Sequence, residues 1–127
     1  MALWQQSQEF AEQIVAIVGK LPKDRATEAI GLQLVRAAGS IAANIAEGYG
    51  RYSQAAYRNH LSIARGSAFE AESWLDLLIR TGHLDHAKGD ALLQKCAYVQ
   101  SMLTTRMKGL GEARETYARE EGTSYEA

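Results

Sequence analysis

The stretch from Arg36 to Arg51, RAAGSIAANIAEGYGR, constrains the fold more than any other part of the chain. It predicts a helix that is apolar almost all the way round and that stops at Gly48-Tyr49-Gly50, where we expect the positive φ angles of a glycine helix end. A surface helix of a globular protein normally buries a single apolar stripe. A helix that is apolar on several sides therefore needs packing partners on several sides.

The predicted helix of residues 24–47 has three faces when it is placed on a wheel of about 100° per residue. The polar stripe consists of Gln33, Arg36, Ser40, Asn44 and Glu47. The bulky apolar face consists of Ile30, Leu34, Ile41 and Ile45. The third face, which has mostly small side chains, consists of Gly31, Val35, Ala38, Gly39, Ala42 and Ala46. Since a monomeric four-helix bundle buries one face of each helix, a second subunit is the simplest cover for the third face.

Three further helices are predicted, over about residues 3–20, 53–80 and 85–110. Pro22 separates the first two helices, and Ser53 is a suitable N-cap for the third. The seam of the third helix follows the spacing of a helical bundle: Tyr57, Leu61, Ala64, Ala68, Ala71, Leu75 and Leu78. The side chains that point away from this seam are assigned to the same oligomer interface: Ile63, Trp74 and Leu77. Short connections predict an all-α, antiparallel up-down-up-down four-helix bundle over residues 1–110.

The charge of the chain is divided unevenly between this bundle and the residues after it. Residues 1–110 hold 12 Lys or Arg and 10 Asp or Glu, a balance of +2, and residues 111–127 hold 2 Arg and 5 Glu, a balance of −3. The last segment has little to bury, so we predict an acidic and mobile C-terminal tail. A body charge of +2 is a weak footprint for nucleic-acid binding.

Composition fits one domain in a reducing compartment. The chain has 127 residues and a single cysteine, Cys96, so an intrachain disulfide is excluded. No apolar run approaches the roughly 20 residues that cross a bilayer, and the N-terminus lacks the pattern of a signal peptide. We therefore expect a cytoplasmic protein with no membrane partner.

The sequence contains no clear catalytic constellation. A ferritin-like metal bundle needs Glu-x-x-His pairs, and Glu47, Glu70 and Glu72 have no histidine three residues later. His83 and His86 form either a weak metal site or, as we prefer, a polar turn between helices. Cys96 falls in a core stripe and is expected to behave as a small hydrophobe. We assign no catalytic, cofactor-binding or metal-binding residue, and we expect a protein that is not an enzyme and has no cofactor.

The polar stripe of the second helix is the best candidate for a specific role. Arg36, Ser40, Asn44 and Glu47 are neighbours along one helix face. The first hypothesis is a polar network between helices that includes Glu70 or Glu72 and fixes the register of the bundle. A solvated face is the second, and a ligand or RNA contact through Arg36 and Arg51 is the third.

Three arginines are candidates for contact with nucleic acid. Arg51, Arg58 and Arg65 recur every seven residues, with Tyr49 and Tyr52 close to the first. Arginines beside aromatic rings bind phosphates and stack on bases. Glu72 and Asp76 continue the same helix face, so internal salt bridges are an equally good interpretation.

Two motifs carry a family resemblance. VRAAGSIAANIAEGYGR and LSIARGSAFEAESWL resemble the four-helix-bundle family of ribosomal-RNA intervening-sequence proteins. The positions that match the first family motif are Arg36, Ser40, Ile41, Asn44, Ile45, Ala46, Glu47, Gly48, Gly50 and Arg51. The positions that match the second are Ala64, Gly66, Ser67 and Glu70. The helical layout agrees from about residue 5 to residue 110.

The same fold group includes the accessory variability determinant of diversity-generating retroelements. The resemblance implies a barrel-like homopentamer with a non-enzymatic role. In the retroelement branch that role is the binding of a reverse transcriptase and its RNA template, and those members look strongly basic, unlike this chain. The sequence favours a homo-oligomeric interaction or scaffold protein, and the resemblance implies a place for it within a ribonucleoprotein or reverse-transcriptase complex. The alternative is a direct RNA- or DNA-binding module that uses the arginines near the turn between the second and third helices.

Overall fold

A computed structural model describes the backbone of residues 1–120 and the side chains of residues 1–111. Its helices are α1 (Ala2–Val18), α2 (Arg25–Tyr49), α3 (Gln54–Arg80) and α4 (His86–Glu120). No strand occurs among residues 1–120, so the predicted all-helical class and the four helices are confirmed for that part of the chain. The helix α4 continues ten residues beyond its predicted end, and residues 121–127 of the predicted tail lie outside the described residues.

Local signals set the starts of three helices. Asp24 caps α2, because its carboxylate accepts hydrogen bonds from the Thr27 backbone N–H at 3.0 Å and from the Thr27 hydroxyl at 2.9 Å. These two hydrogen bonds hold the pKa of the Asp24 carboxyl below its usual value. Ser53 caps α3 as predicted, through the Ala56 N–H at 3.1 Å. The Asp85 carboxylate accepts the Lys88 N–H at 2.9 Å, at the start of α4.

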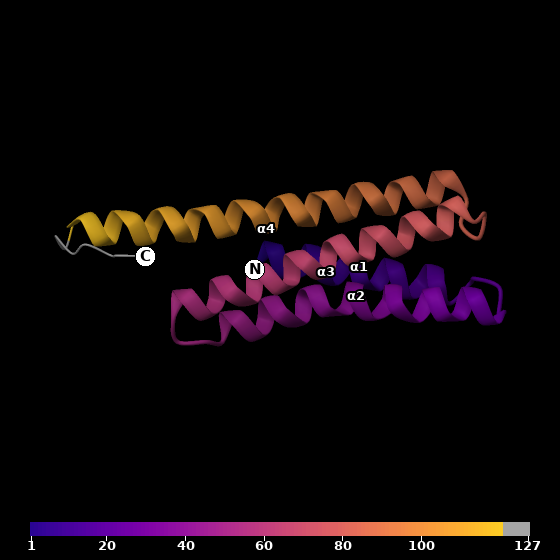
Figure 1. Ribbon diagram of the computed structural model, residues 1–127, viewed down its shortest axis with the longest axis horizontal. Helices are drawn as coiled ribbons and strands as arrows, with labels where there is room; N and C mark the ends of the chain where they lie inside the picture. The colour runs from indigo at the N-terminus through magenta and orange to yellow at the C-terminus, as the bar shows by residue number, and fades with distance from the viewer. Residues whose placement is uncertain (121–127) are drawn as a thin grey trace.

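The four helices form one bundle with a shared core. Figure 1 shows the turns at alternating ends of the bundle, so that each helix lies beside the next along the chain. The helices α1 and α4 also pack against each other, and Lys95 of α4 forms an ion pair with Glu9 of α1 at 3.2 Å. The largest fully buried side chains come from all four helices: Leu3, Phe10, Ile14, Leu34, Ile41, Ile45, Leu61, Leu75, Leu78, Val99 and Leu103.

Glycine in the α2–α3 turn has a different role from the one predicted. Among the described residues, Gly82 after α3 is the single glycine with positive φ, at 77°. Gly48 lies within α2, and Gly50 has the right-handed values φ −78° and ψ −2°, so the predicted positive φ angles are wrong. Gly48 is instead a packing residue, because a Cβ there would lie 2.5 Å from the Cβ of His60 in α3.

The helix α2 is unusually apolar for its degree of burial. Among the described residues it alone is long and apolar enough to span a bilayer by composition, with a mean hydropathy of 1.3 over its best 18-residue window. A helix in the core of a soluble bundle can be equally long and apolar. In this chain 39% of that window is buried, and the exposed apolar residues of α2 include Leu32, Gly39, Ala43 and Ala46.

Candidate interaction surface

Part of the small face of α2 is covered by the chain itself. Gly31 is buried, and Ala38 and Ala42 are 1% and 2% exposed. A Cβ at position 31 would lie 3.0 Å from the Val18 side chain of α1. These three residues therefore need no second subunit for cover, contrary to the prediction, because α2 is packed by neighbours within its own bundle on more than one side.

The rest of that face opens into a groove between α1 and α2. Gly39 and Ala46 are exposed, and Val35 is half-buried. The groove has a volume of about 660 Å³ and is lined by Trp4, Gln8, Ala11, Glu12, Val15, Ala16, Gly39 and Ala43. A second hollow of about 300 Å³ continues it past Trp4 and is lined by Met1, Trp4, Ala46 and Tyr49. We call these two hollows together the α1–α2 groove.

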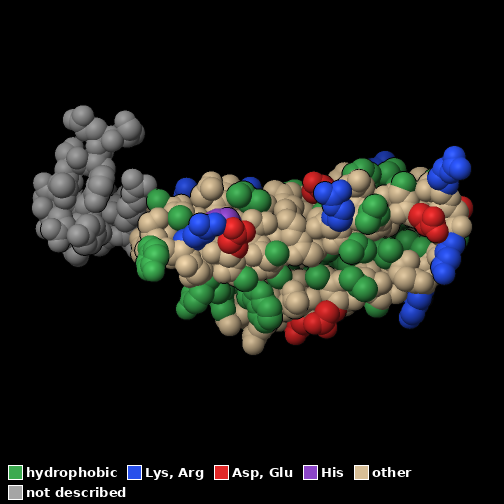
Figure 2. Space-filling model, turned by 90° about the horizontal axis from the view of Figure 1, so that it is seen from below, with side chains coloured by type: hydrophobic (Ala, Val, Ile, Leu, Met, Phe, Trp, Pro, Cys, Tyr) green, Lys and Arg blue, Asp and Glu red, His purple; other side chains and the backbone are tan. Residues whose placement is uncertain are grey.

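Large apolar side chains stand exposed along this groove. Trp4 is 37% exposed, Val15 56% and Tyr49 67%. From the side on which α2 lies, much of the surface is hydrophobic or uncharged, and charged side chains stand in separate groups at both ends and near the middle (Figure 2). Of these groove residues, Gly39 and Ala46 belong to the predicted interface set, which stays a prediction, and Trp4, Val15 and Ala43 do not. Trp4 and Val15 lie off the apolar stripe of α1, and Ala43 lies beside the small face of α2.

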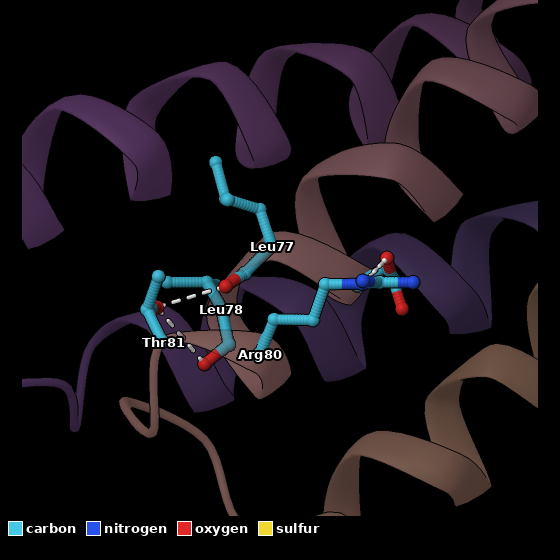
Figure 3. Close-up of polar contacts among 5 residues, drawn as sticks. Leu77, Leu78, Arg80 and Thr81 are labelled. Atoms are coloured by element: carbon cyan, nitrogen blue, oxygen red, sulfur yellow. Dashed lines mark hydrogen bonds and ion pairs between the residues drawn. The ribbon is translucent and has the colours of Figure 1, made fainter.

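Three apolar side chains of α3 are also exposed. Ile63 is 46% exposed, Phe69 43% and Leu77 36%, and polar residues of the helix separate them. Figure 3 shows the Leu77 side chain pointing away from the Thr81 hydroxyl, which donates to the Leu77 carbonyl oxygen at 2.8 Å. Trp74, also predicted for the interface, is half-buried and donates its indole N–H to Glu70 at 3.2 Å.

A polar network does join α2 to α3, with membership that differs from the prediction. The Asn44 amide donates to the Ser40 hydroxyl at 3.0 Å, and the Ser67 hydroxyl donates to the same Ser40 oxygen at 3.1 Å. The Asn44 side-chain oxygen lies 3.3 Å from Nδ1 of His60. An amide oxygen can only accept, so His60 carries its proton on Nδ1 in this contact. Sequence reasoning found Ser40 and Asn44 but missed His60 and Ser67 as their partners.

The other predicted members of the network lie outside it. Glu47 forms an exposed ion pair with Arg51 at 2.8 Å, and Glu70 accepts from Trp74. Arg36 is exposed on the outer side of α2. The Glu47 and Glu70 carboxylates reach partners on their own helix or turn. The hydrogen bonds between α2 and α3 are therefore made by the shorter Ser and Asn side chains.

The three arginines proposed for nucleic acid all make contacts within the chain. Arg51 pairs with Glu47, the Arg58 Nε donates to the Met107 carbonyl oxygen at 3.4 Å, and the Arg65 Nε donates to the Thr104 hydroxyl at 3.0 Å. The Arg65 guanidinium also lies 4.9 Å from the centre of the Phe69 ring. Arg58 and Arg65 therefore tie α3 to α4 through a carbonyl and a hydroxyl oxygen. The salt bridges expected in the alternative interpretation occur for Arg51, with Glu47, and Asp76 pairs with Arg80 instead.

The histidine pair and the cysteine have structural surroundings. His83 Nδ1 lies 2.8 Å from the Thr81 hydroxyl, in the turn after α3. Within the part of the chain that the structure describes, no three His, Cys, Asp or Glu side chains gather in a way that could hold a metal ion. The Cys96 thiol is buried and donates to the Ala68 carbonyl oxygen at 3.2 Å, and its burial raises its pKa to about 12. A thiol with so high a pKa forms little of the nucleophilic thiolate at neutral pH.

Comparison with known proteins identifies the family. No protein with a curated function matches the chain. A crystal structure of a protein of unknown function, from the S23 ribosomal protein family of Bacteroides thetaiotaomicron, has a TM-score of 0.79 and 31% sequence identity to this chain. The match covers 84% of this chain and 98% of that one. The family model described as 23S rRNA-intervening sequence protein matches residues 1–105, so this chain belongs to the family of 23S rRNA-intervening sequence proteins.

Proposed function

We propose that this protein is a homo-oligomeric interaction protein whose subunits associate through the α1–α2 groove. The observation that carries the proposal is the apolar lining of the α1–α2 groove, where Trp4 is 37%, Val15 56% and Tyr49 67% exposed. Exposed apolar surface rimmed by polar residues marks an interaction site on a soluble domain. The matched family model names no catalytic activity, and the related crystal structure is of a protein of unknown function, so a binding role is also the simplest account.

The proposal extends to the assembly and its setting. Five subunits is the number that the family resemblance implies, and a closed ring would give a partner several equivalent binding faces. We place the assembly in the cytoplasm, as a scaffold for a ribonucleoprotein or a reverse-transcriptase complex. The single buried thiol and the relationship to a bacterial ribosomal-protein family support this setting.

The test is the solution mass of two matched variants. Ala43 lines the groove and is exposed, so Ala43→Arg puts a long charged side chain into the groove without disturbing the core. Ala97 is an exposed alanine of α4 away from the groove, and Ala97→Arg makes the same chemical change there. We expect light scattering after size-exclusion chromatography to give a smaller assembly for Ala43→Arg and the wild-type assembly for Ala97→Arg. Equal masses for both variants would contradict the proposal.

A second candidate function is direct binding of RNA or DNA at the α2–α3 turn. The observation that favours it is a pair of exposed aromatic rings, Tyr49 at 67% and Tyr52 fully exposed, on either side of Arg51. Exposed rings beside arginines suit stacking on unpaired bases. The proposal predicts an affinity that falls steeply with salt and is lost in Arg51→Ala plus Arg58→Ala.

The control for this second candidate is Arg80→Ala at the opposite end of α3. Arg80 also forms an exposed ion pair, with Asp76 at 2.6 Å, so its removal matches the loss of the Arg51–Glu47 pair. If fluorescence anisotropy with single-stranded RNA gives no binding at low salt, or equal binding for both variants, the candidate fails.

A further inference from the structure

The exposed face between α3 and α4 is basic along the half that lies towards the α2–α3 turn. Arg58 and Arg65 of α3 are exposed and reach across to α4, where their Nε atoms donate to the Met107 carbonyl oxygen at 3.4 Å and to the Thr104 hydroxyl at 3.0 Å. Lys108 is exposed one helical turn beyond Thr104, so it lies on the same side of α4. We call Arg58, Arg65 and Lys108 the basic patch.

The two arginines of the basic patch keep their full positive charge. Both of their acceptors are neutral oxygen atoms, and neither arginine forms an ion pair with another of residues 1–111. Arg51 and Arg80 differ, because each pairs with a carboxylate four residues away. The adjoining stretches carry no negative charge either, since residues 54–69 of α3 and the part of α4 between Asp90 and Glu112 contain no acidic residue.

The basic patch is short. Arg58 and Arg65 are seven residues apart, which is roughly 10 Å along α3. Glu72 follows after another seven residues on the same helix face, and Asp76 comes one turn later. Exposed charges more than about 8 Å apart are largely screened at physiological ionic strength, so the patch attracts only groups that lie close to it. A long anionic ligand that continues along α3 therefore meets carboxylates.

These properties favour a protein ligand over nucleic acid. A nucleic-acid strand gains its affinity from many phosphate contacts along its length, whereas this chain has three cations in the patch and a formal net charge of −1. An extended protein segment rises about 3.3 Å per residue, so roughly three residues span the distance between the two arginines. Phe69 borders the patch, but the Arg65 guanidinium lies 4.9 Å from its ring centre, and a base that stacked on that side would displace it.

We propose that the basic patch binds a short acidic segment of a partner protein, whose carboxylates pair with Arg58 and Arg65. A guanidinium whose Nε is bonded to α4 still offers its two terminal nitrogens to a carboxylate. Side chains that are already held in place lose less conformational entropy on binding. The inference goes beyond the proposed homo-oligomer, because the patch lies on α3 and α4 and none of its residues lines the α1–α2 groove.

The test is fluorescence anisotropy with two labelled probes of equal charge, amidated hexaglutamate and heptauridine. Arg58→Gln plus Arg65→Gln removes both guanidinium charges and keeps amide groups that can donate to α4. The matched control is Arg80→Gln plus Lys88→Gln, which removes two exposed charges from the same two helices at the other end of the bundle. We expect hexaglutamate to bind the wild-type protein at low salt, with an affinity roughly tenfold lower for the patch variant and unchanged for the control.

The contrary outcomes are distinct from one another. Failure of hexaglutamate to bind the wild-type protein, or an equal loss of affinity in both variants, overturns the inference. Tighter binding of heptauridine than of hexaglutamate, lost in the patch variant, overturns it in favour of the nucleic-acid candidate. If circular dichroism shows that the patch variant does not fold, Lys108→Gln against Lys88→Gln makes the same comparison with one exposed charge each. A monomeric wild-type protein that binds hexaglutamate supports this inference and contradicts the proposed homo-oligomer.

Discussion

Gly48 and His60 lie so close across the α2–α3 contact that a Cβ at position 48 would fall 2.5 Å from the His60 Cβ. The same added atom would lie 3.1 Å from the Tyr57 ring. The His60 Cβ is bonded directly to the α3 backbone and cannot turn away. The two helices can therefore keep this distance only while position 48 has no side chain.

Gly48→Ala should destabilise the fold. We expect a loss of about 1–3 kcal/mol, because overpacking a tight contact forces the backbone or the side chains to shift. The control is Gly66→Ala in α3, where an added Cβ meets nothing within 4 Å. Alanine has the higher helix propensity, so Gly66→Ala should be neutral or stabilising by up to about 1 kcal/mol. Urea denaturation measures both, and equal stabilities would contradict the role given to Gly48.

The Asp24 cap should make stability depend on pH. Its folded-state pKa is lowered by the two hydrogen bonds from Thr27, so the folded state binds a proton less readily than the unfolded state. The stability from this group is present above the ordinary pKa of an aspartate and is lost as the pH falls through the lowered value. Asp24→Ala should thus be less stable than wild type at pH 7, with a difference that narrows in acid.

Asp24→Asn is the control for that prediction. Asparagine is also a good N-cap but does not titrate, so this variant should keep most of the stability at pH 7. Thermal denaturation of the three proteins between pH 7 and pH 3 gives the comparison. A wild-type advantage over Asp24→Ala that does not change with pH would show that the carboxylate charge is not involved.

Asn44 should contribute through its contacts with both Ser40 and His60. Asn44→Ala removes the amide that donates to Ser40 and the oxygen that faces His60. Since the site is half-buried, we expect a loss of about 1–2 kcal/mol. Asn59→Ala, at an exposed position of α3, is the control and should change the stability little. The free energies of unfolding test this, and equal values for the two variants would count against the network.

Cys96 should be inert in the native protein. Its thiol is buried and its pKa is raised to about 12 by burial. A disulfide reagent at pH 8 should therefore react only after denaturant unfolds the chain, at the concentration where circular dichroism also changes. Rapid labelling of the native protein would contradict the burial of this side chain.

Local features of the fold were predictable because local signals determine them. The Ser53 cap, the break at Pro22 and the periodic seam of α3 depend on residues close together in sequence, and the structure has them as expected. The end of α2 was misjudged because Gly48 suggests a turn, whereas close packing against His60 is what requires a glycine there.

The candidate surface was only partly predictable for a related reason. Periodicity reveals that the small face of α2 is apolar, but it does not reveal which neighbour covers each residue. The same chain buries Ala38 and Ala42, and the groove contains Gly39 and Ala46. The partnership of Asn44 with His60 likewise depends on the register between two helices, which their separate sequences do not specify.

The most direct test of the central claim is native mass spectrometry of the wild-type protein, purified at low salt. We expect a closed oligomer, with five subunits as the number implied by the family resemblance. Nucleic acid retained on that oligomer would support the ribonucleoprotein setting. A monomer at micromolar concentration would contradict the claim that the exposed apolar side of α2 is covered by another copy of the chain.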